Sequence, residues 1–372
     1  MSDSPSILIS INAAWNIYNF RKSLIERLKD EGFTVISAAP DDAYSERLRQ
    51  IVDEHHHIPM SNAGASPLQD LLLFYGYVRL LKQLKPSIML GYSIKPNVYG
   101  SFACGLLGIP IINNVSGLGT VFIKRNWVTI VAKLLYQSAF KLSSTVFFQN
   151  KDDRKLFITE KLVDSRKAEL IPGSGIDLEH YKPRERATDE NPSFVLIARM
   201  LWDKGVGEYV QAAALVKEHY PNVTFNLVGP IGVDNRTAIA ESKIKEWDAA
   251  NTIHYLGETD DVRSVIAENS AVVLPSYREG MSRVLLEGLA MGRPLIATNV
   301  PGCKHTIDDG KNGFLCKSKD AKDLATKIIQ FIELSELERV NMGNESRKKA
   351  EAEFDQEIVL NAYVKKIKSL IS

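Results

Sequence analysis

Short apolar runs alternate with helical patterns along the first half of the chain, and this alternation limits the fold more than any other feature. Ser6–Ile11 is an apolar run, and the residues after it repeat at helical spacing through Leu28. Further apolar runs, separated by helical segments, occupy Phe33–Ala39, Ser87–Tyr92, Pro110–Val115 and Thr145–Gln149. Strands that alternate with helices form parallel sheets covered on both faces. The sequence therefore predicts an α/β fold with a doubly wound sheet.

The same alternation starts again after a polar segment that contains two prolines, Lys182–Pro192. The second series of apolar runs comprises Phe194–Arg199, Val223–Gly229, Ile253–Leu256, Ala271–Pro275 and Pro294–Thr298. Because 372 residues exceed what one core usually organises, we expect two Rossmann-like domains, 1–176 and 177–355. Such sheets bind ligands at the carboxyl ends of their strands, so we expect the domains to face a cleft. The helical pattern at 356–372 predicts a C-terminal helix that crosses back to the first domain.

The overall charge of the chain is balanced, but the distribution of charge is uneven. Lys and Arg number 46 and Asp and Glu number 45, so net charge gives no indication of a nucleic-acid partner. Between Leu71 and Lys151 there is no Asp or Glu, whereas there are nine Lys or Arg residues. We expect this stretch to face an anionic partner, unless it consists only of scattered surface lysines.

Three further features predict a cytoplasmic protein without a membrane-spanning segment. The three cysteines, Cys104, Cys303 and Cys316, are too few and too widely spaced for a disulfide framework. The first residues lack the basic segment of a secretory signal. The longest uncharged run, between Lys95 and Lys124, contains prolines, asparagines and glycines, which favour a strand, a turn and a helix over a membrane span.

The segment Pro275–Pro294 predicts a strand end, a tight turn and the start of a helix. Ser282 is a favourable N-cap residue, and the free amide groups of a helix start suit a phosphate group. Gly280 allows a ligand to approach the backbone closely. Glu279 lies in the turn and Glu287 about one turn into the helix, where both could accept hydrogen bonds from sugar hydroxyl groups. Either glutamate alone is more often a solvated surface charge.

A second group of candidate residues follows the first strand of the second domain. Arg199 and Lys204 lie in the sequence Ala-Arg-Met-Leu-Trp-Asp-Lys-Gly at 198–205. A doubly wound domain places its phosphate site in this loop. Arg199 could donate two parallel hydrogen bonds to a diphosphate, and Lys204 adds a point charge. The alternative is that both side chains follow the end of a strand and bind no ligand.

The chain lacks the motifs of several other enzyme classes. It contains no Asp-x-Asp pair for a nucleotide-bound metal ion, no P-loop and no dinucleotide-binding glycine motif. The run His55–His57 predicts no metal site, because adjacent side chains of an extended segment point to opposite sides. We therefore expect no metal and no cofactor. Arg199, Lys204 and the helix start after Glu279 are expected to neutralise a leaving diphosphate.

With these motifs the chain resembles the retaining family 4 glycosyltransferases of the GT-B fold over nearly its whole length. The resemblance is carried by Arg199 with Lys204-Gly205, Pro-Ser-x-Arg-Glu-Gly with Glu287, Asn299-Val-Pro-Gly302 and Asp309-Gly-Lys-Asn-Gly-Phe314. It implies that Glu279, Arg199 and Lys204 are catalytic residues. It also implies that Glu287 binds the ribose of a nucleotide diphosphate sugar, which is a substrate and not a cofactor.

The first domain narrows the resemblance to bacterial enzymes that extend lipid-diphosphate-linked glycans. Tyr92–Gly100 and Val115–Phe122 are similar to segments of this subgroup. Many family members have a histidine near the sugar in the first domain, but residues 58–179 contain none, so Asn114 or Ser116 is expected to replace it. The predicted substrate-binding residues besides Glu287 are Gly280, Met281, Ser282, Arg278, Asn16, Lys95, Asn97, Asn114, Ser116 and Gly117.

The sequence thus predicts a retaining glycosyltransferase of the hexosyltransferase class. The expected donor is a UDP-sugar that carries a hexose or N-acetylhexosamine. The expected acceptor is a lipid-diphosphate-linked or other glycan in bacterial surface polysaccharide or glycan biosynthesis. Two alternatives stay open: a sugar-nucleotide epimerase of the same fold, which needs its own acid and base residues, and a non-catalytic nucleotide-sugar-binding scaffold.

The helical segment Asn126–Leu142 predicts a contact with an anionic membrane surface. Ile130, Val131, Leu134, Leu135 and Leu142 are expected to pack on the core, and Thr129, Lys133, Tyr136 and Phe140 to face outward. Lysine beside aromatic rings suits a membrane interface, and Lys124 and Arg125 precede the segment. We therefore expect peripheral association with the cytoplasmic face of the inner membrane. The alternative is a helix buried on both faces.

Overall fold

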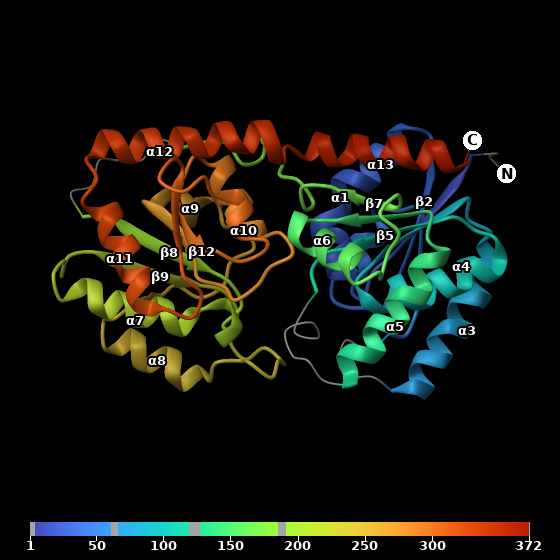
Figure 1. The fold of residues 1–372 in the computed structure, drawn as a ribbon, viewed down its shortest axis with the longest axis horizontal. Helices are drawn as coiled ribbons and strands as arrows, with labels where there is room; N and C mark the ends of the chain where they lie inside the picture. Colours follow the sequence, from blue (N-terminus) through green and yellow to red (C-terminus); the bar gives the residue numbers. More distant parts are fainter. Residues whose placement is uncertain (1–3, 61–65, 119–126, 185–190, 372) are drawn as a thin grey trace. The chain divides into compact units, whose positions relative to one another are not determined.

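The computed structural model describes residues 4–60, 66–118, 127–184 and 191–371. The chain forms two compact units (Figure 1). Unit 1 is Met1–Ser174 with Glu357–Ser372, and unit 2 is Gly175–Gln356. The sequence suggests 176/177 and 355/356 for the corresponding boundaries.

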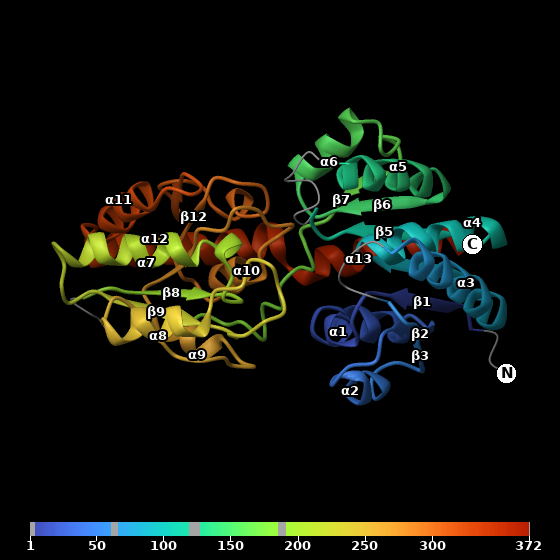
Figure 2. The same cartoon turned by 90° about the horizontal axis from the view of Figure 1, so that it is seen from below.

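Unit 1 contains a parallel seven-stranded sheet in the order β3-β2-β1-β4-β5-β6-β7 (Figure 2). Its strands are β1 (Ser6–Ser10), β2 (Thr34–Ala39), β3 (Glu54–His57), β4 (Ile88–Tyr92), β5 (Ile111–Val115), β6 (Thr145–Phe148) and β7 (Ala168–Leu170). Its helices are α1 (Ala14–Asp30), α2 (Ser45–Arg49), α3 (Pro67–Leu84), η1 (Pro96–Gly100), α4 (Ser101–Leu107), α5 (Trp127–Leu142), α6 (Lys151–Thr159) and α13 (Gln356–Ile371).

The central strands of unit 1 bury side chains on both faces of the sheet. On β1, Ile7 and Ile9 pack with α1 and α13, whereas Leu8 between them packs with α3 and α4. Successive side chains of a strand point to opposite faces, so a strand covered on both sides must be apolar throughout. This pattern confirms the predicted doubly wound sheet.

The C-terminal helix α13, drawn in red at the end of the chain in Figure 1, belongs to the core of unit 1. Its buried residues include Leu360, Tyr363 and Ile367, which share a core cluster with Ile17 and Leu24 of α1. These positions recur at helical spacing and form one apolar stripe. The predicted return of the C-terminal helix to the first domain is therefore confirmed.

Unit 2 contains a parallel six-stranded sheet in the order β10-β9-β8-β11-β12-β13. Its strands are β8 (Ser193–Ile197), β9 (Thr224–Val228), β10 (His254–Tyr255), β11 (Ala271–Leu274), β12 (Leu295–Thr298) and β13 (Gly313–Cys316). Its helices are η3 (Trp202–Lys204), α7 (Val206–Lys217), α8 (Glu241–Ala249), α9 (Arg263–Glu268), α10 (Arg283–Ala290), η4 (Lys304–Thr306), α11 (Ala321–Ile332), α12 (Glu336–Lys349) and η5 (Ala350–Phe354).

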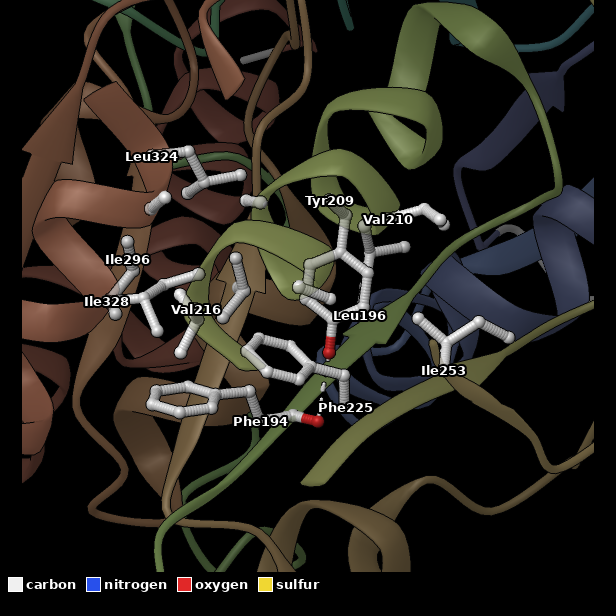
Figure 3. Close-up of a cluster of buried hydrophobic side chains, with 14 of the residues drawn as sticks. Phe194, Leu196, Tyr209, Val210, Val216, Phe225, Ile253, Ile296, Leu324 and Ile328 are labelled. Atoms are coloured by element: carbon white, nitrogen blue, oxygen red, sulfur yellow. Dashed lines mark hydrogen bonds between the residues drawn. The ribbon is translucent and has the colours of Figure 1, made fainter. Parts of the chain in front are cut away.

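The largest core cluster of unit 2 lies between the sheet and helices α7 and α11 (Figure 3). Phe194 of β8 stacks on Phe225 of β9, with ring centroids 5.3 Å apart. The buried hydroxyl of Tyr209 shares its one proton between the Phe194 and Asn226 carbonyl oxygens, which lie at 2.9 and 3.1 Å. A buried phenol needs such a partner, so Tyr209 fixes α7 against the strands.

The structure reverses the predicted orientation of α5. Thr129, Tyr136 and Phe140 are buried, whereas Ile130 and Leu134 are 61% and 57% exposed. The rings of Tyr136 and Phe140 pack on Phe157 of α6, with centroids 5.3 and 6.1 Å apart, respectively. Aromatic rings bury more surface than leucine or valine, so in a helix that is apolar all round the aromatic face packs inward.

The surface of α5 also differs from the predicted basic surface. Lys133 does not stand free beside the rings, because its Nζ lies 2.5 Å from Oε2 of Glu160. Lys124 and Arg125 lie outside the described residues. Within the described ranges, no helix is both long enough and apolar enough to cross a membrane.

Candidate functional site

Two loops at the carboxyl edge of the unit 2 sheet bring the predicted catalytic residues together. Lys204 ends η3, after β8, and Glu279 lies in the loop between β11 and α10. The Lys204 Nζ donates a hydrogen bond to Glu279 Oε1 at 2.5 Å, and both side chains are only partly exposed. The structure thus joins an ammonium and a carboxylate that are 75 residues apart in the sequence.

Close backbone contacts fix these two loops. The Tyr277 amide donates to the Asp203 carbonyl at 3.0 Å. Gly205 has a φ of 75°, and a Cβ atom there would lie 2.1 Å from the Pro275 carbonyl oxygen. Only glycine adopts this backbone without strain and leaves room for the carbonyl, so Gly205 lets the Lys204 loop pack on the strand end before Glu279.

Arg199 lies on the same loop as Lys204, three residues before η3. Its side chain is exposed, and it forms no ion pair with any residue that the structure describes. An exposed guanidinium presents a planar set of donors that matches a phosphate group. The carboxyl edge of unit 2 therefore offers one cation that is already paired with a carboxylate, Lys204, and one that is available, Arg199.

Glu287 lies in α10 as part of a buried cluster. Its Oε1 accepts hydrogen bonds from the Tyr181 hydroxyl at 3.0 Å and from Arg283 Nε at 3.1 Å. Burial raises the pKa of the Glu287 carboxyl, and the Arg283 charge opposes this shift. The cluster holds the carboxylate in one orientation, which is a requirement for recognising a hydroxyl pair.

Neither partner of Glu287 was among the predicted site residues. Arg283 precedes it by four positions on the same helix, and this spacing is a recognisable signal for an ion pair. Tyr181 is 106 residues away in the sequence, so no local pattern could reveal it.

The other predicted residues of unit 2 surround the start of α10. Arg278, Gly280 and Met281 are partly buried in the loop before the helix. Ser282 takes the predicted N-cap position, but its side chain forms no capping hydrogen bond, and its amide donates to the Gly302 carbonyl at 3.1 Å. Their contacts with a substrate stay predictions.

In unit 1, Asn114 at the end of β5 lies at the centre of a buried hydrogen-bond network. Its Nδ2 donates to the Tyr363 hydroxyl of α13 at 2.9 Å. Its Oδ1 accepts from Ser116 Oγ at 3.0 Å and from Gln149 Nε2 at 3.4 Å. Because Asn114 is buried and satisfied within the unit, only Ser116 of the two candidates for the absent histidine is exposed.

The remaining predicted residues of unit 1 follow β1, β4 and β5. Asn97 is fully buried, and its Nδ2 donates to the Asn114 carbonyl at 2.9 Å, so it supports the loop after β5. Lys95 lies 3.0 Å from Asp70 of α3. Asn16, in the first turn of α1, and Gly117 are partly buried. The structure therefore places Asn97 and Asn114 inside the unit, whereas Asn16, Lys95, Ser116 and Gly117 reach its surface.

The histidine run of β3 is engaged in local contacts. His55 lies 2.8 Å from Ser37 Oγ and 3.1 Å from Asp41 Oδ1. In the part of the chain that the structure describes, no group of three or more His, Cys, Asp or Glu side chains has a geometry that could hold a metal ion.

Two family models match the chain, one for each unit. The model for "Glycosyl transferase 4-like" matches residues 6–150. The model for "Glycosyl transferases group 1" matches residues 178–349, which include all the candidate residues of unit 2.

Curated relatives match over most of their length. The chain is 29% identical over 371 residues to N,N'-diacetylbacillosaminyl-diphospho-undecaprenol alpha-1,3-N-acetylgalactosaminyltransferase of Campylobacter jejuni, covering 95% of this chain and 96% of the relative. It is 26% identical over 286 residues to UDP-Gal:alpha-D-GlcNAc-diphosphoundecaprenol alpha-1,3-galactosyltransferase of Escherichia coli, covering 73% of each chain.

Solved structures share the fold. A glycosyltransferase from Rickettsia africae matches with a TM-score of 0.81 and 20% identity over the whole of both chains. Anabaena HepE in complex with UDP matches with a TM-score of 0.78 and 17% identity, over 98% of this chain and all of that chain. The chain therefore belongs to the GT-B glycosyltransferases, with a glycosyl transferase 4-like first unit and a glycosyl transferases group 1 second unit.

Proposed function

We propose that this glycosyltransferase moves a hexose or N-acetylhexosamine from a UDP-sugar, with retention, onto a lipid-diphosphate-linked glycan. The proposed role is the extension of bacterial surface polysaccharides or related glycans. The pairing of Lys204 with Glu279 at 2.5 Å beside the exposed Arg199 carries the proposal, because it supplies both a diphosphate site and a sugar ligand. The names of the two relatives support the class of acceptor.

Unit 2 is proposed to bind the donor. Arg199 and Lys204 stabilise the negative charge that develops on the leaving diphosphate. Glu279 accepts hydrogen bonds from the transferred sugar, and Glu287, held by Tyr181 and Arg283, accepts them from the ribose. Binding of the diphosphate would compete with Glu279 for the Lys204 ammonium, so the ion pair compensates the Lys204 charge until the donor arrives.

The proposed chemistry is a substitution with retention. The bond between the anomeric carbon and the diphosphate oxygen breaks, and its electron pair stays on that oxygen. The acceptor hydroxyl attacks the same face of the sugar, and its proton passes to a phosphate oxygen of the leaving group. The positive side chains of unit 2 act by stabilising this leaving group and take no proton.

Unit 1 is proposed to bind the acceptor and to contact the anionic cytoplasmic face of the inner membrane. The stretch Leu71–Lys151, which contains no carboxylate, supports this assignment. Negative lipid headgroups attract such basic segments, and salt weakens the attraction.

The test is a panel of nucleotide sugars assayed with short prenyl-diphosphate sugars, with products identified by mass spectrometry. Transfer to the diphosphate-linked sugar is the expected result. Conversion of the nucleotide sugar without an acceptor would indicate an epimerase instead. Binding of the nucleotide sugar without any turnover would indicate a scaffold and contradict the proposal.

A further inference from the structure

One face of α3 in unit 1 is apolar and exposed. Leu68, Leu71, Leu72 and Tyr75 are 68%, 50%, 62% and 60% exposed, respectively. Their spacing places them on one stripe of the helix, while Leu73, Tyr77 and Leu81 fill the core on the other side. Scattered apolar residues need no explanation, but a contiguous apolar stripe at a surface marks a binding site.

A groove runs along this stripe. It is an open cavity of about 390 Å³, lined by Pro67, Asp70, Leu71 and Phe74 of α3 and by Tyr99 and Phe102 of η1 and α4. Helices α3 and α4 lie side by side in Figures 1 and 2. Ligand pockets of roughly 300–1,000 Å³ with mostly apolar walls and few polar groups are typical small-molecule sites.

An ammonium group contacts one of the residues that line the groove. Lys95, just after β4, approaches Oδ1 of Asp70 to 3.0 Å, and both side chains are largely buried. Asp70 itself lines the groove, so an anionic group that enters there could replace its carboxylate beside the Lys95 ammonium. Burial and the Asp70 carboxylate also raise the pKa of Tyr99, so this hydroxyl stays protonated beside the pair.

These features fit a ligand with an anionic group next to an alkyl chain. Helices of a doubly wound sheet begin near the carboxyl ends of the strands, so the start of α3 and Lys95 both lie at the ligand edge of unit 1. From Leu71 to Lys151 the sequence contributes no other carboxylate that would repel an anion. Contact with a bilayer surface would require only the exposed apolar stripe and would not require the Lys95 ammonium, which is largely buried.

We propose that this groove binds the prenyl chain of the acceptor, while Lys95 leaves Asp70 to meet the acceptor diphosphate. The inference rests on the proposed function, because it assumes a lipid-diphosphate acceptor. The first prenyl units lie between Leu71, Phe74 and Phe102, and the stripe from Leu68 to Tyr75 guides the rest of the chain away from the site.

The test compares two water-soluble acceptors with the same sugar diphosphate, one with an ethyl group and one with a farnesyl chain, without detergent or vesicles. Each buried methylene group contributes a factor of about four, so the wild-type KM should be at least roughly tenfold lower for the farnesyl acceptor. Leu71→Ser should remove most of this advantage and leave transfer to the ethyl acceptor unchanged. Lys95→Met should raise the KM for both acceptors equally.

Leu337→Ser, at a leucine that is 70% exposed on α12 of unit 2, is the matched control and should keep the full advantage. The proposal is overturned if Leu71→Ser keeps the advantage, or if the wild type transfers to both acceptors with equal KM. Loss of vesicle binding in Leu71→Ser with an unchanged KM ratio would assign the stripe to the bilayer and also overturn the proposal. If the wild type used neither acceptor, the proposed function would fail; saturable binding of farnesyl diphosphate, weakened by Leu71→Ser, would still support the groove.

Discussion

The sheets of the two units share one strand order, to which unit 1 adds β7, but their carboxyl edges carry different chemistry. In unit 2 the edge presents charged side chains, Lys204 with Glu279 and the exposed Arg199. In unit 1 the corresponding edge carries an amide and hydroxyl network around Asn114, the ion pair of Lys95 with Asp70, and the start of the apolar stripe of α3. The fold determines where a ligand binds, and the loop residues determine which ligand it is. The exposed and paired cations of unit 2 suit a diphosphate donor, whereas the apolar stripe of unit 1, with one lysine paired to a carboxylate, suits a lipid-linked acceptor.

The largest effect is expected when the cations of unit 2 are removed. Arg199→Ala or Lys204→Ala should lower kcat by roughly two to three orders of magnitude, as for the loss of one charge-stabilising donor. The fold should stay intact, because both side chains lie at the surface of loops that backbone contacts hold. Initial rates with saturating donor and circular dichroism spectra are the measurements.

Lys317→Ala, which removes a lysine that is 76% exposed in unit 2, is the control and should leave kcat near the wild-type value. If both Arg199→Ala and Lys204→Ala retained near-normal transfer, the assignment of the diphosphate site would be wrong. The charged side chains at the carboxyl edge of unit 2 would then have no special role in the reaction.

A second prediction compares two buried tyrosine hydroxyls, one in each unit. Tyr363→Phe leaves the Nδ2 group of Asn114 without its acceptor inside unit 1, which should cost about 1–3 kcal/mol of unfolding free energy. Tyr209→Phe removes a donor from two strand carbonyls that keep their partners in the sheet of unit 2, so it should cost about 0.5–1.5 kcal/mol. Urea unfolding of the two variants measures the difference.

The same pair of variants also tests whether α13 supports the acceptor side. Tyr363→Phe should raise the KM for the acceptor more than the KM for the donor, since Asn114 also holds the exposed Ser116. A larger stability loss for Tyr209→Phe, or equal changes in both KM values, would contradict the role of the Asn114 network.

The central strands of both sheets could be predicted because a strand buried on both faces is a continuous apolar run. Three edge strands were missed: β3 is Glu-His-His-His, β7 has three residues, and β13 follows a glycine-containing turn, whereas the edge strand β10 lies within the predicted run Ile253–Leu256. An edge strand has one neighbour and little buried surface, so its sequence carries a weak signal. The predicted orientation of α5 was wrong because apolar residues occur on all its faces, and the inward face is selected by packing on other elements, such as the contact of Tyr136 with the Phe157 ring.

Candidate site residues could be proposed from the sequence only where they lie close together along the chain. Arg199 with Lys204, and Glu279 with Glu287, are local groups whose residue types indicate their chemistry. The contacts of Tyr181 with Glu287 and of Tyr363 with Asn114 join residues that are 106 and 249 positions apart. The burial of Asn97 and Asn114 likewise depends on the packing of whole elements, which no local pattern contains.

A smaller effect is expected from the pH dependence of Glu287. Burial raises its pKa in the folded protein above the ordinary value of 4.5. The folded state therefore binds more protons than the unfolded state between pH 4.5 and the raised pKa, and the unfolding free energy should fall as pH rises through this window. The Glu287→Gln variant has no titrating carboxyl at this position, so its unfolding free energy should not show this decrease.

The measurement is urea unfolding of the wild type and Glu287→Gln across this pH range, because other titrating groups cancel in the difference. An increase in the stability of the wild type relative to the variant with rising pH would mean that the Arg283 charge outweighs burial. The pKa of the Glu287 carboxyl would then be lowered by its cationic partner, as in an ordinary surface ion pair.

The smallest effect is expected from the removal of divalent metal ions. A divalent cation needs several oxygen ligands, usually including carboxylates, but Glu279 is already compensated by Lys204 at 2.5 Å. Lys204 and the exposed Arg199 can supply the positive charge that a metal ion would bring to a leaving diphosphate. The initial rate of sugar transfer should therefore be unchanged in excess EDTA, and unchanged again on addition of Mn²⁺ or Mg²⁺. A metal-dependent transferase assayed beside it should lose its activity and regain it. Loss of transfer in EDTA with recovery in Mn²⁺ would show that Arg199 and Lys204 do not suffice to stabilise the leaving diphosphate. The carboxyl edge of unit 2 would then differ from that of unit 1 by a bound metal ion as well as by its charged side chains.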